Sequence, residues 1–232
     1  MKVDDAVETI TRFFNDLIGA WVPGLVLAVG LVIMHLGPDY IKLLAKLSDG
    51  VGVTMTMTMA GLLFALGHLL LAVNEAAMKP LLKVSKVIRD FDEVKARTRQ
   101  SYRLFSELVD ELQSGGNSVW QFHDLRSVAL SVSDEAASLG RRFMFISLLC
   151  SGVGTALFVI MLDYLFCLYF LPELLYGYER VAPWGVQAIL LVIAAAFLFK
   201  QADVFYARAM STPFSVAVAE LKFKRGTNAG NP

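Results

Sequence analysis

Four long stretches of this chain contain no Asp, Glu, Lys or Arg, and they limit what the chain can fold into. They lie between Asp16 and Asp39, Asp49 and Glu75, Arg142 and Asp163, and Arg180 and Lys200. A helix needs about 20 apolar residues to cross about 30 Å of hydrocarbon, and each stretch reaches about that length. With 56% hydrophobic and only 18% charged residues, the sequence predicts an integral membrane protein rather than a soluble globular enzyme.

We expect an all-α membrane protein with four transmembrane helices, at 17–36, 51–73, 143–171 and 181–199. Between the second and third spans we expect a cytoplasmic, antiparallel, coiled-coil-like helical hairpin. Pro183 and Gln187 dilute the fourth span, so three spans and one buried helix are the alternative. The remaining segments are an interfacial amphipathic helix at 1–16, outer loops at 37–50 and 172–180, the hairpin at 74–142, and a C-terminal helix and tail at 200–232. That last helix is expected to end near 211–213, with residues 225–232 disordered.

The basic residues are distributed unevenly along the chain. If both termini and the segment 74–142 share one side of the membrane, that side holds 18 of the 21 Lys and Arg residues. Only Lys42, Lys46 and Arg180 lie on the other side. Because basic residues are enriched in cytoplasmic loops, this pattern predicts a bacterial inner-membrane protein with both termini in the cytoplasm. The formal net charge is zero, so no direct nucleic-acid partner is expected.

The hairpin segment carries a seam of residues spaced alternately by three and four, which is typical of coiled coils. Its members are Val84, Ile88, Phe91, Lys95, Thr98, Tyr102 and Phe105 in the first half, and Phe122, Leu125 and Val132 in the second. The run Ser114-Gly115-Gly116-Asn117 can reverse the chain between the halves. The longer first half leaves part of the seam uncovered. The N-terminal segment, the C-terminal segment or another subunit then covers it, so the hairpin is either an ordinary soluble fold or a surface for oligomers or partners.

Methionine and threonine alternate near the start of the second span. Met55 and Met59 share a helix face, and thioethers are soft ligands for Cu(I). The pair resembles the Met-x-x-x-Met motif of the copper-transporter family, which implies a trimeric three-span pore, although four spans are expected here. The alternative is that the two methionines pack against lipid or neighbouring helices. No cofactor and no other metal site is expected. Thr54 and Thr58 either bond to their own helix carbonyls or line a pore in an oligomer.

Small residues follow one face of the third span. Ser147, Ser151 and Thr155 recur every four residues, which allows close helix approach within or between subunits. The Gly154-Thr155 pair is similar to the proton-channel family of motor stators and energy transducers, but that family's mid-span prolines are missing. The ionisable residues His35, His68 and Asp163 fall at the edges of spans, which disfavours a proton relay at the membrane midplane.

No nucleotide-binding glycine loop, His-Glu-x-x-His or Cys-x-x-Cys motif occurs, so we expect a non-enzymatic protein. The layout resembles that of small multi-span effectors in bacterial antiphage and abortive-infection systems. We expect an oligomeric effector that forms a pore or disturbs the bilayer when a soluble cytoplasmic partner engages the hairpin at 74–142, which we call the stalk. The alternatives are a sensor or scaffold that recruits a soluble partner, and a small transporter or stator-like channel subunit.

Overall fold

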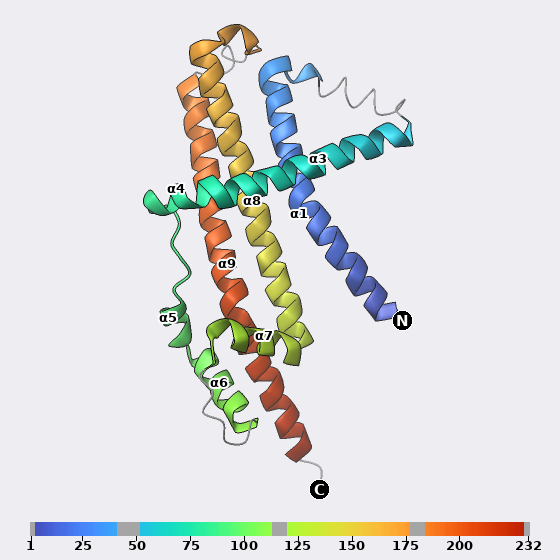
Figure 1. Cartoon of the computed structure of the whole chain (residues 1–232), viewed down its shortest axis with the longest axis vertical. Coiled ribbons are helices and arrows are strands. Elements are labelled where there is room, and N and C mark those ends of the chain that lie inside the picture. Colours follow the sequence, from blue (N-terminus) through green and yellow to red (C-terminus); the bar gives the residue numbers. More distant parts are fainter. Residues whose placement is uncertain (1–2, 41–51, 113–119, 177–183, 230–232) are drawn as a thin grey trace. The chain divides into compact units, whose positions relative to one another are not determined.

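A computed structural model describes residues 3–40, 52–112, 120–176 and 184–229. Every element in these ranges is a helix, which confirms the all-α prediction (Figure 1). Four helices are long and apolar enough to cross a membrane, namely Ile18–Leu36, Val53–Val84, Asp134–Phe170 and Gly185–Lys222. The chain divides into two compact units, with unit 1 formed by Met1–Arg89 and Ser147–Ala202, and unit 2 by Asp90–Ile146 and Asp203–Pro232.

Unit 1 contains the apolar helices. α1 (Val3–Leu36) is one helix through the expected interfacial segment and first span. α3 (Val53–Val73) continues through a π-helix, Asn74–Met78, into α4 (Lys79–Val84), so the second apolar helix extends past the expected end of its span. The unit also holds the second part of α8 (Asp134–Phe170), the 3-10 helix Pro172–Leu174 and the first part of α9 (Trp184–Ala229).

α1 and α3 cross at very close range. A Cβ atom built on Gly24 would stand 2.0 Å from the carbonyl oxygen of Leu63, and one on Gly67 would stand 1.6 Å from that of Ala20. Only glycine permits such an approach of two helix backbones. Figure 1 shows α3 lying across α1, with its first half extending away from the crossing.

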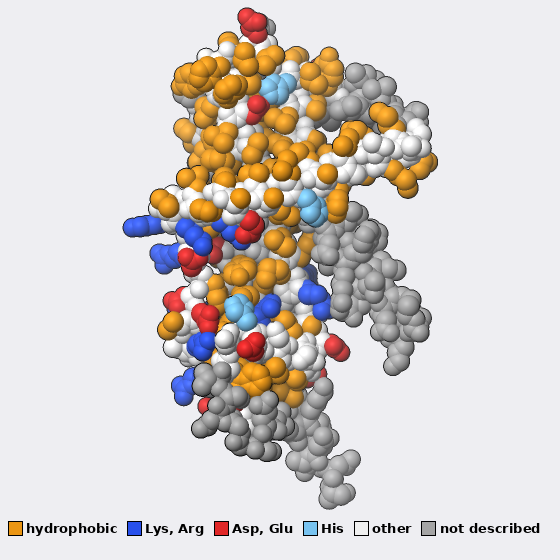
Figure 2. Space-filling view, viewed as in Figure 1, with side chains coloured by type: hydrophobic (Ala, Val, Ile, Leu, Met, Phe, Trp, Pro, Cys, Tyr) orange, Lys and Arg blue, Asp and Glu red, His pale blue; other side chains and the backbone are white. Residues whose placement is uncertain are grey.

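α8 is the central helix of unit 1. A Cβ atom on its Gly152 would meet the ring of Pro23 in α1, and one on Gly154 would meet the ring of Phe199 in α9. Leu27 and Ile160 belong to the core between α1 and α8, while Met78, Ala195 and Phe199 belong to a second core beside α9. On the face shown in Figure 2, hydrophobic side chains cover most of unit 1, and charged side chains gather over α4 and unit 2.

Unit 2 has an aromatic core. α5 (Glu93–Arg97), α6 (Gln100–Leu112) and α7 (Phe122–Val132) pack with the second part of α9. The ring of Phe214 in α9 lies 5.1 Å from Tyr102, 5.8 Å from Phe105 and 5.3 Å from Phe122, measured between ring centroids. The C-terminal segment therefore packs on Tyr102, Phe105 and Phe122, whereas Lys95 and Thr98 of the longer first half stay exposed.

The first half of the expected hairpin is not one helix. α4 ends in a Schellman motif, in which the amide of Val87 donates to Leu82 O at 3.0 Å and that of Lys86 to Lys83 O at 3.1 Å. Lys86 takes the left-handed conformation that this motif requires, with φ 60°. The chain becomes helical again where the carboxylate of Asp92 accepts from the amide of Lys95 at 2.8 Å. The expected continuous seam is thus divided.

The second half is interrupted as well. Ser133 has extended backbone between α7 and α8, and its hydroxyl accepts from the amide of Ala136 at 3.1 Å. Tyr102 and Phe122 both lie in the first turn of their helices, yet their rings stack at 5.6 Å. In an antiparallel hairpin, Phe122 would instead face the end of α6. The expected turn at 114–117 lies outside the described residues.

The C-terminal helix also differs from the expectation. α9 continues through Pro213 and ends at Ala229, instead of ending near 211–213. Pro213 is fully buried, and its ring lies beside Gly140 of α8. Tertiary packing therefore outweighs the cost of a proline inside this helix.

Candidate functional site

The small polar residues Ser147, Ser151 and Thr155 of α8 are buried within unit 1. Ser147 donates to Ala202 O in α9 at 2.8 Å, and Ser151 donates to Leu148 O at 3.0 Å. Thr155, which is fully buried, lies within hydrogen-bonding distance of Ser151 O at 2.9 Å. Of these three bonds, the one from Ser147 joins two helices, and the other two lie within α8.

Asn74 is a buried polar residue that sequence reasoning missed. It opens the π-helix between α3 and α4 and is 2% exposed. Its Oδ1 atom accepts from the hydroxyl of Thr155 at 3.3 Å. π-Helical turns are common at functional positions, and a buried amide in an apolar layer requires partners. The available sequence signal was a single polar residue at the edge of a charge-free stretch.

The Met and Thr residues of the second span lie on an exposed helix. We define the α3 arm as residues 53–62, all of which are exposed. Met55 is 59% exposed and Met59 is 48% exposed. The hydroxyl of Thr58 donates to Thr54 O at 2.9 Å, so Thr58 bonds to its own helix in the single chain, which is one of the two alternatives.

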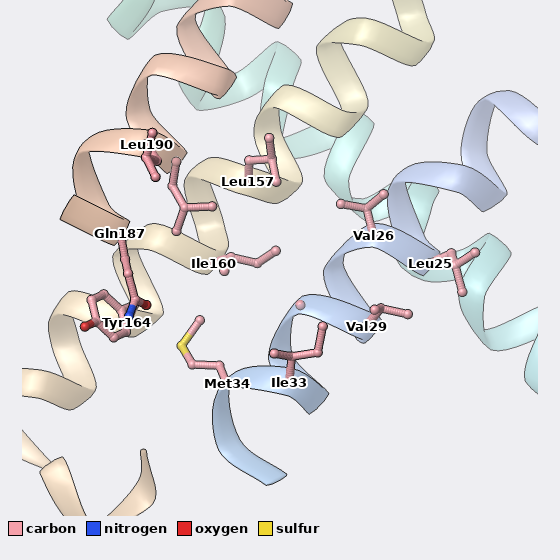
Figure 3. Close-up of a pocket in the computed structure, with 12 residues that line it drawn as sticks. Leu25, Val26, Val29, Ile33, Met34, Leu157, Ile160, Tyr164, Gln187 and Leu190 are labelled. Atoms are coloured by element: carbon pink, nitrogen blue, oxygen red, sulfur yellow. The ribbon is translucent and has the colours of Figure 1, made fainter. Parts of the chain in front are cut away.

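A cavity of about 540 Å³ lies between α1, α8 and α9. Its lining is apolar apart from Tyr164 and Gln187, which lie close together at one side (Figure 3). Val29 and Ile33 of α1 and Ile160 of α8 are among the apolar residues that line it. A cavity with this lining accepts apolar groups and disfavours charged ones.

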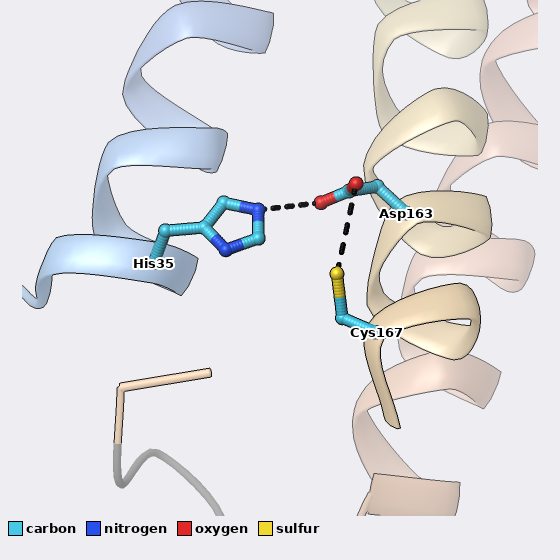
Figure 4. Close-up of side chains that lie close together, drawn as sticks. All are labelled: His35, Asp163 and Cys167. Atoms are coloured by element: carbon cyan, nitrogen blue, oxygen red, sulfur yellow. Dashed lines mark hydrogen bonds and ion pairs between the residues drawn. The ribbon is translucent and has the colours of Figure 1, made fainter. Parts of the chain in front are cut away.

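A polar cluster lies where α1 and α8 end. The Nε2 atom of His35 is 2.7 Å from Oδ2 of Asp163 (Figure 4). The sulfur of Cys167, one turn further along α8, is 3.9 Å from Oδ1 of the same carboxylate. The three groups are of types that can hold a metal ion, and their ligand atoms lie within 4.8 Å of one another. Sequence reasoning placed His35 and Asp163 at the edges of spans.

The segment after α8 fixes the histidine end of this cluster. The Nδ1 atom of His35 is 3.1 Å from the carbonyl oxygen of Leu174. The amide of Tyr176 donates to Met34 O at 3.0 Å, and the Tyr176 ring lies against Gly37, whose φ is +91°. A carbonyl oxygen can only accept, so Nδ1 carries a proton and Nε2 faces the carboxylate.

The predicted seam residues of the stalk divide into buried and exposed groups. Tyr102, Phe105, Phe122 and Leu125 are buried in the aromatic core of unit 2. Phe91 packs against that core and Ile88 against the core beside α9, both partly buried. The others are exposed, namely Val84, Lys95, Thr98 and Val132.

Burial shifts the pKa of two residues in unit 2. Burial raises the pKa of the Tyr102 phenol, although the charge of Arg97 acts in the opposite direction. Burial likewise lowers the pKa of the Arg126 guanidinium, which remains charged at neutral pH. Both shifts have the sign expected when a charged form is removed from water.

Arg126 has a structural role that the sequence did not reveal. Pro213 has no amide hydrogen, so it cannot donate to the carbonyl of Ala209, four residues earlier. The guanidinium of Arg126 donates to that carbonyl oxygen through Nη2 at 3.3 Å and Nε at 3.4 Å. An arginine from α7 thereby replaces the hydrogen bond that proline removes from α9.

Comparison of the chain with models of known protein families, with curated proteins and with solved structures finds no match. Any functional assignment therefore comes from the residues and their geometry.

Proposed function

We propose that this protein is an oligomeric effector of the bacterial inner membrane, which opens a pore or disturbs the bilayer when its cytoplasmic unit is engaged. The observation that carries the proposal is the exposed α3 arm. In the apolar window of Val53–Val84 only 11% of residues are buried, the smallest share among the four candidate spans. A strongly apolar helix that its own chain leaves uncovered requires lipid or other copies to cover it.

Two faces of the arm support an oligomer with a polar interior. Thr54 and Thr58 lie four residues apart and share one face, while Thr56 lies on the opposite side of the helix. Copies that turn the first face inward would place a ring of hydroxyl and carbonyl groups around a shared axis. Met55, Met57 and Met59 would then contact lipid and neighbouring copies.

Two continuous helices support the coupling of a cytoplasmic signal to the membrane. α8 and α9 each belong partly to unit 1 and partly to unit 2. Phe214 of α9 lies at the centre of the aromatic core in unit 2. Because a helix transmits displacement along its axis, a partner that shifts this core would also shift the apolar part of α9.

The charge distribution supports the orientation. Unit 2 and the terminal segments carry most of the basic residues, and this excess favours the cytoplasm for both termini. Engagement of unit 2 would then involve a soluble cytoplasmic protein.

The proposal is tested by measuring membrane potential and dye entry in bacteria that express the full chain. We expect depolarisation that is lost in the double variant Thr54→Val/Thr58→Val and retained in Thr56→Val, its matched control on the same helix. Phe214→Ala, which opens the core of unit 2, should alter the onset of depolarisation. Membrane fractionation confirms equal amounts of each variant.

Unchanged potential and dye exclusion for both the natural chain and Phe214→Ala would contradict the effector proposal. Capture of a soluble protein by the natural chain, without depolarisation, would instead favour the sensor or scaffold alternative. Equal loss of activity in Thr56→Val and the double variant would refute the pore-facing assignment of Thr54 and Thr58.

A further inference from the structure

We propose that His35, Asp163 and Cys167 bind one divalent transition-metal ion of the zinc class at the end of unit 1. The inference is independent of the effector proposal, because it concerns residues of α1 and α8 outside the α3 arm. The three side chains offer one nitrogen, one carboxylate oxygen and one sulfur ligand within 4.8 Å of one another. Borderline-soft Zn²⁺ accepts this combination, whereas Mg²⁺ and Ca²⁺ prefer oxygen ligands alone.

The orientation of His35 is the one that metal binding requires. Its Nδ1 atom lies 3.1 Å from the carbonyl oxygen of Leu174 and donates to it. Metal-binding histidines commonly donate their second ring nitrogen to a carbonyl, which fixes the ring and directs the other nitrogen to the ion. Nε2 therefore points toward Asp163 with its position already set (Figure 4).

The distances allow coordination after small side-chain movements. Two atoms bound to one tetrahedral zinc ion at about 2.0–2.3 Å lie about 3.3–3.6 Å apart. His35 Nε2 and Asp163 Oδ2 are 2.7 Å apart and must separate slightly, while Cys167 Sγ, 3.9 Å from Oδ1, must approach. With side chains of His35 and Asp163 still 27% and 32% exposed, the fourth position is open to water or another ligand.

Charge also favours a dication at this location. A neutral imidazole, one carboxylate and one thiolate carry two negative charges, which Zn²⁺ neutralises. The bound site would be uncharged, and this lowers the cost of placing it beside apolar helices. Zinc binds the thiolate and an unprotonated imidazole nitrogen, so affinity is expected to rise with pH.

The test is cobalt and zinc titration of the full-length protein, purified in detergent and stripped with chelator. We expect one Co²⁺ per chain, with the intense visible bands of tetrahedral cobalt and a thiolate charge-transfer band in the near ultraviolet. Cys167→Ser should remove the charge-transfer band. Cys150→Ser is the matched control, because Cys150 is the other cysteine of the chain and lies on the same helix outside the cluster. This variant should keep both the visible bands and the charge-transfer band.

His35→Ala and Asp163→Asn should each weaken Zn²⁺ binding by about tenfold or more, whereas His68→Ala should leave it unchanged. Circular dichroism and gel filtration show whether each variant folds, and Cys167→Ser keeps the inference testable if His35→Ala does not. Absence of stoichiometric binding would show that the cluster is a His–Asp ion pair alone. Retention of the charge-transfer band in Cys167→Ser would also overturn the proposal.

Discussion

Replacement of Gly67 by alanine tests the close crossing of α1 and α3 most directly. The new Cβ atom would stand 1.6 Å from the oxygen, 2.5 Å from the carbonyl carbon and 3.1 Å from the Cα atom of Ala20. Carbon and oxygen atoms approach to about 3.3 Å, so the helices must separate by about 1.7 Å. Backbone atoms cannot rotate away as a side chain would, and the reciprocal contact at Gly24 must open as well.

The expected loss of unfolding free energy is about 3 kcal/mol, the upper end of the range for overpacked sites. A gap of 0.5–1 Å already removes about a quarter to a half of the attraction between packed atoms. Gly61→Ala is the matched control on the same helix, since a Cβ atom there meets nothing within 4 Å. Helix propensity predicts that this control is neutral or more stable by up to about 1 kcal/mol.

The assay is unfolding of the purified protein in mixed detergent micelles with increasing dodecyl sulfate, followed by circular dichroism. Membrane insertion of each variant is checked by fractionation, so that a stability difference is not confused with poor expression. If Gly67→Ala and Gly61→Ala unfold within about 0.5 kcal/mol of each other, the argument from backbone contact is refuted.

Three further predictions concern buried polar groups. Arg126→Leu should cost about 1–3 kcal/mol of unfolding free energy, and Pro213→Ala, which restores a backbone donor, should reduce that cost in a double-mutant cycle. Simple additivity would count against the replacement bond. The raised pKa of Tyr102 contributes stability below pH of about 10 that is lost as pH rises further, so Tyr102→Phe should flatten the alkaline unfolding curve. An identical curve would contradict this reasoning. Thr155→Val should cost about 0.5–2 kcal/mol, and adding Asn74→Leu should recover part of it, whereas a further loss would refute the pairing.

The helix breaks show why the stalk was only partly predictable. The spacing of Tyr102, Phe105, Phe122 and Leu125 correctly marked residues that become buried. The same spacing included Val84, which is 83% exposed, because α4 ends in a Schellman motif. That motif normally signals itself through glycine. Here a lysine takes the left-handed position, so the local sequence carries no stop signal.

The cluster of His35, Asp163 and Cys167 could not have been predicted from spacing. His35 and Asp163 are separated by 128 residues; His35 lies in the first charge-free stretch, and Asp163 bounds the third. Each alone resembles an ordinary residue at the edge of a span. Cys167 follows Asp163 by one helical turn, which was the available local signal, but only the packing of α1 against α8 supplies the histidine.

The sequence by itself determined the kind of protein, because length and the absence of charge are properties of single segments. Four apolar helices and an aromatic stalk core follow from such local patterns. Tertiary structure alone decided which helices meet. The glycine crossing, the pairing of Asn74 with Thr155 and the bond from Arg126 to Ala209 all join segments distant in the chain. Their physical basis is close packing, in which a missing Cβ or amide hydrogen at one residue is matched by a particular atom at another.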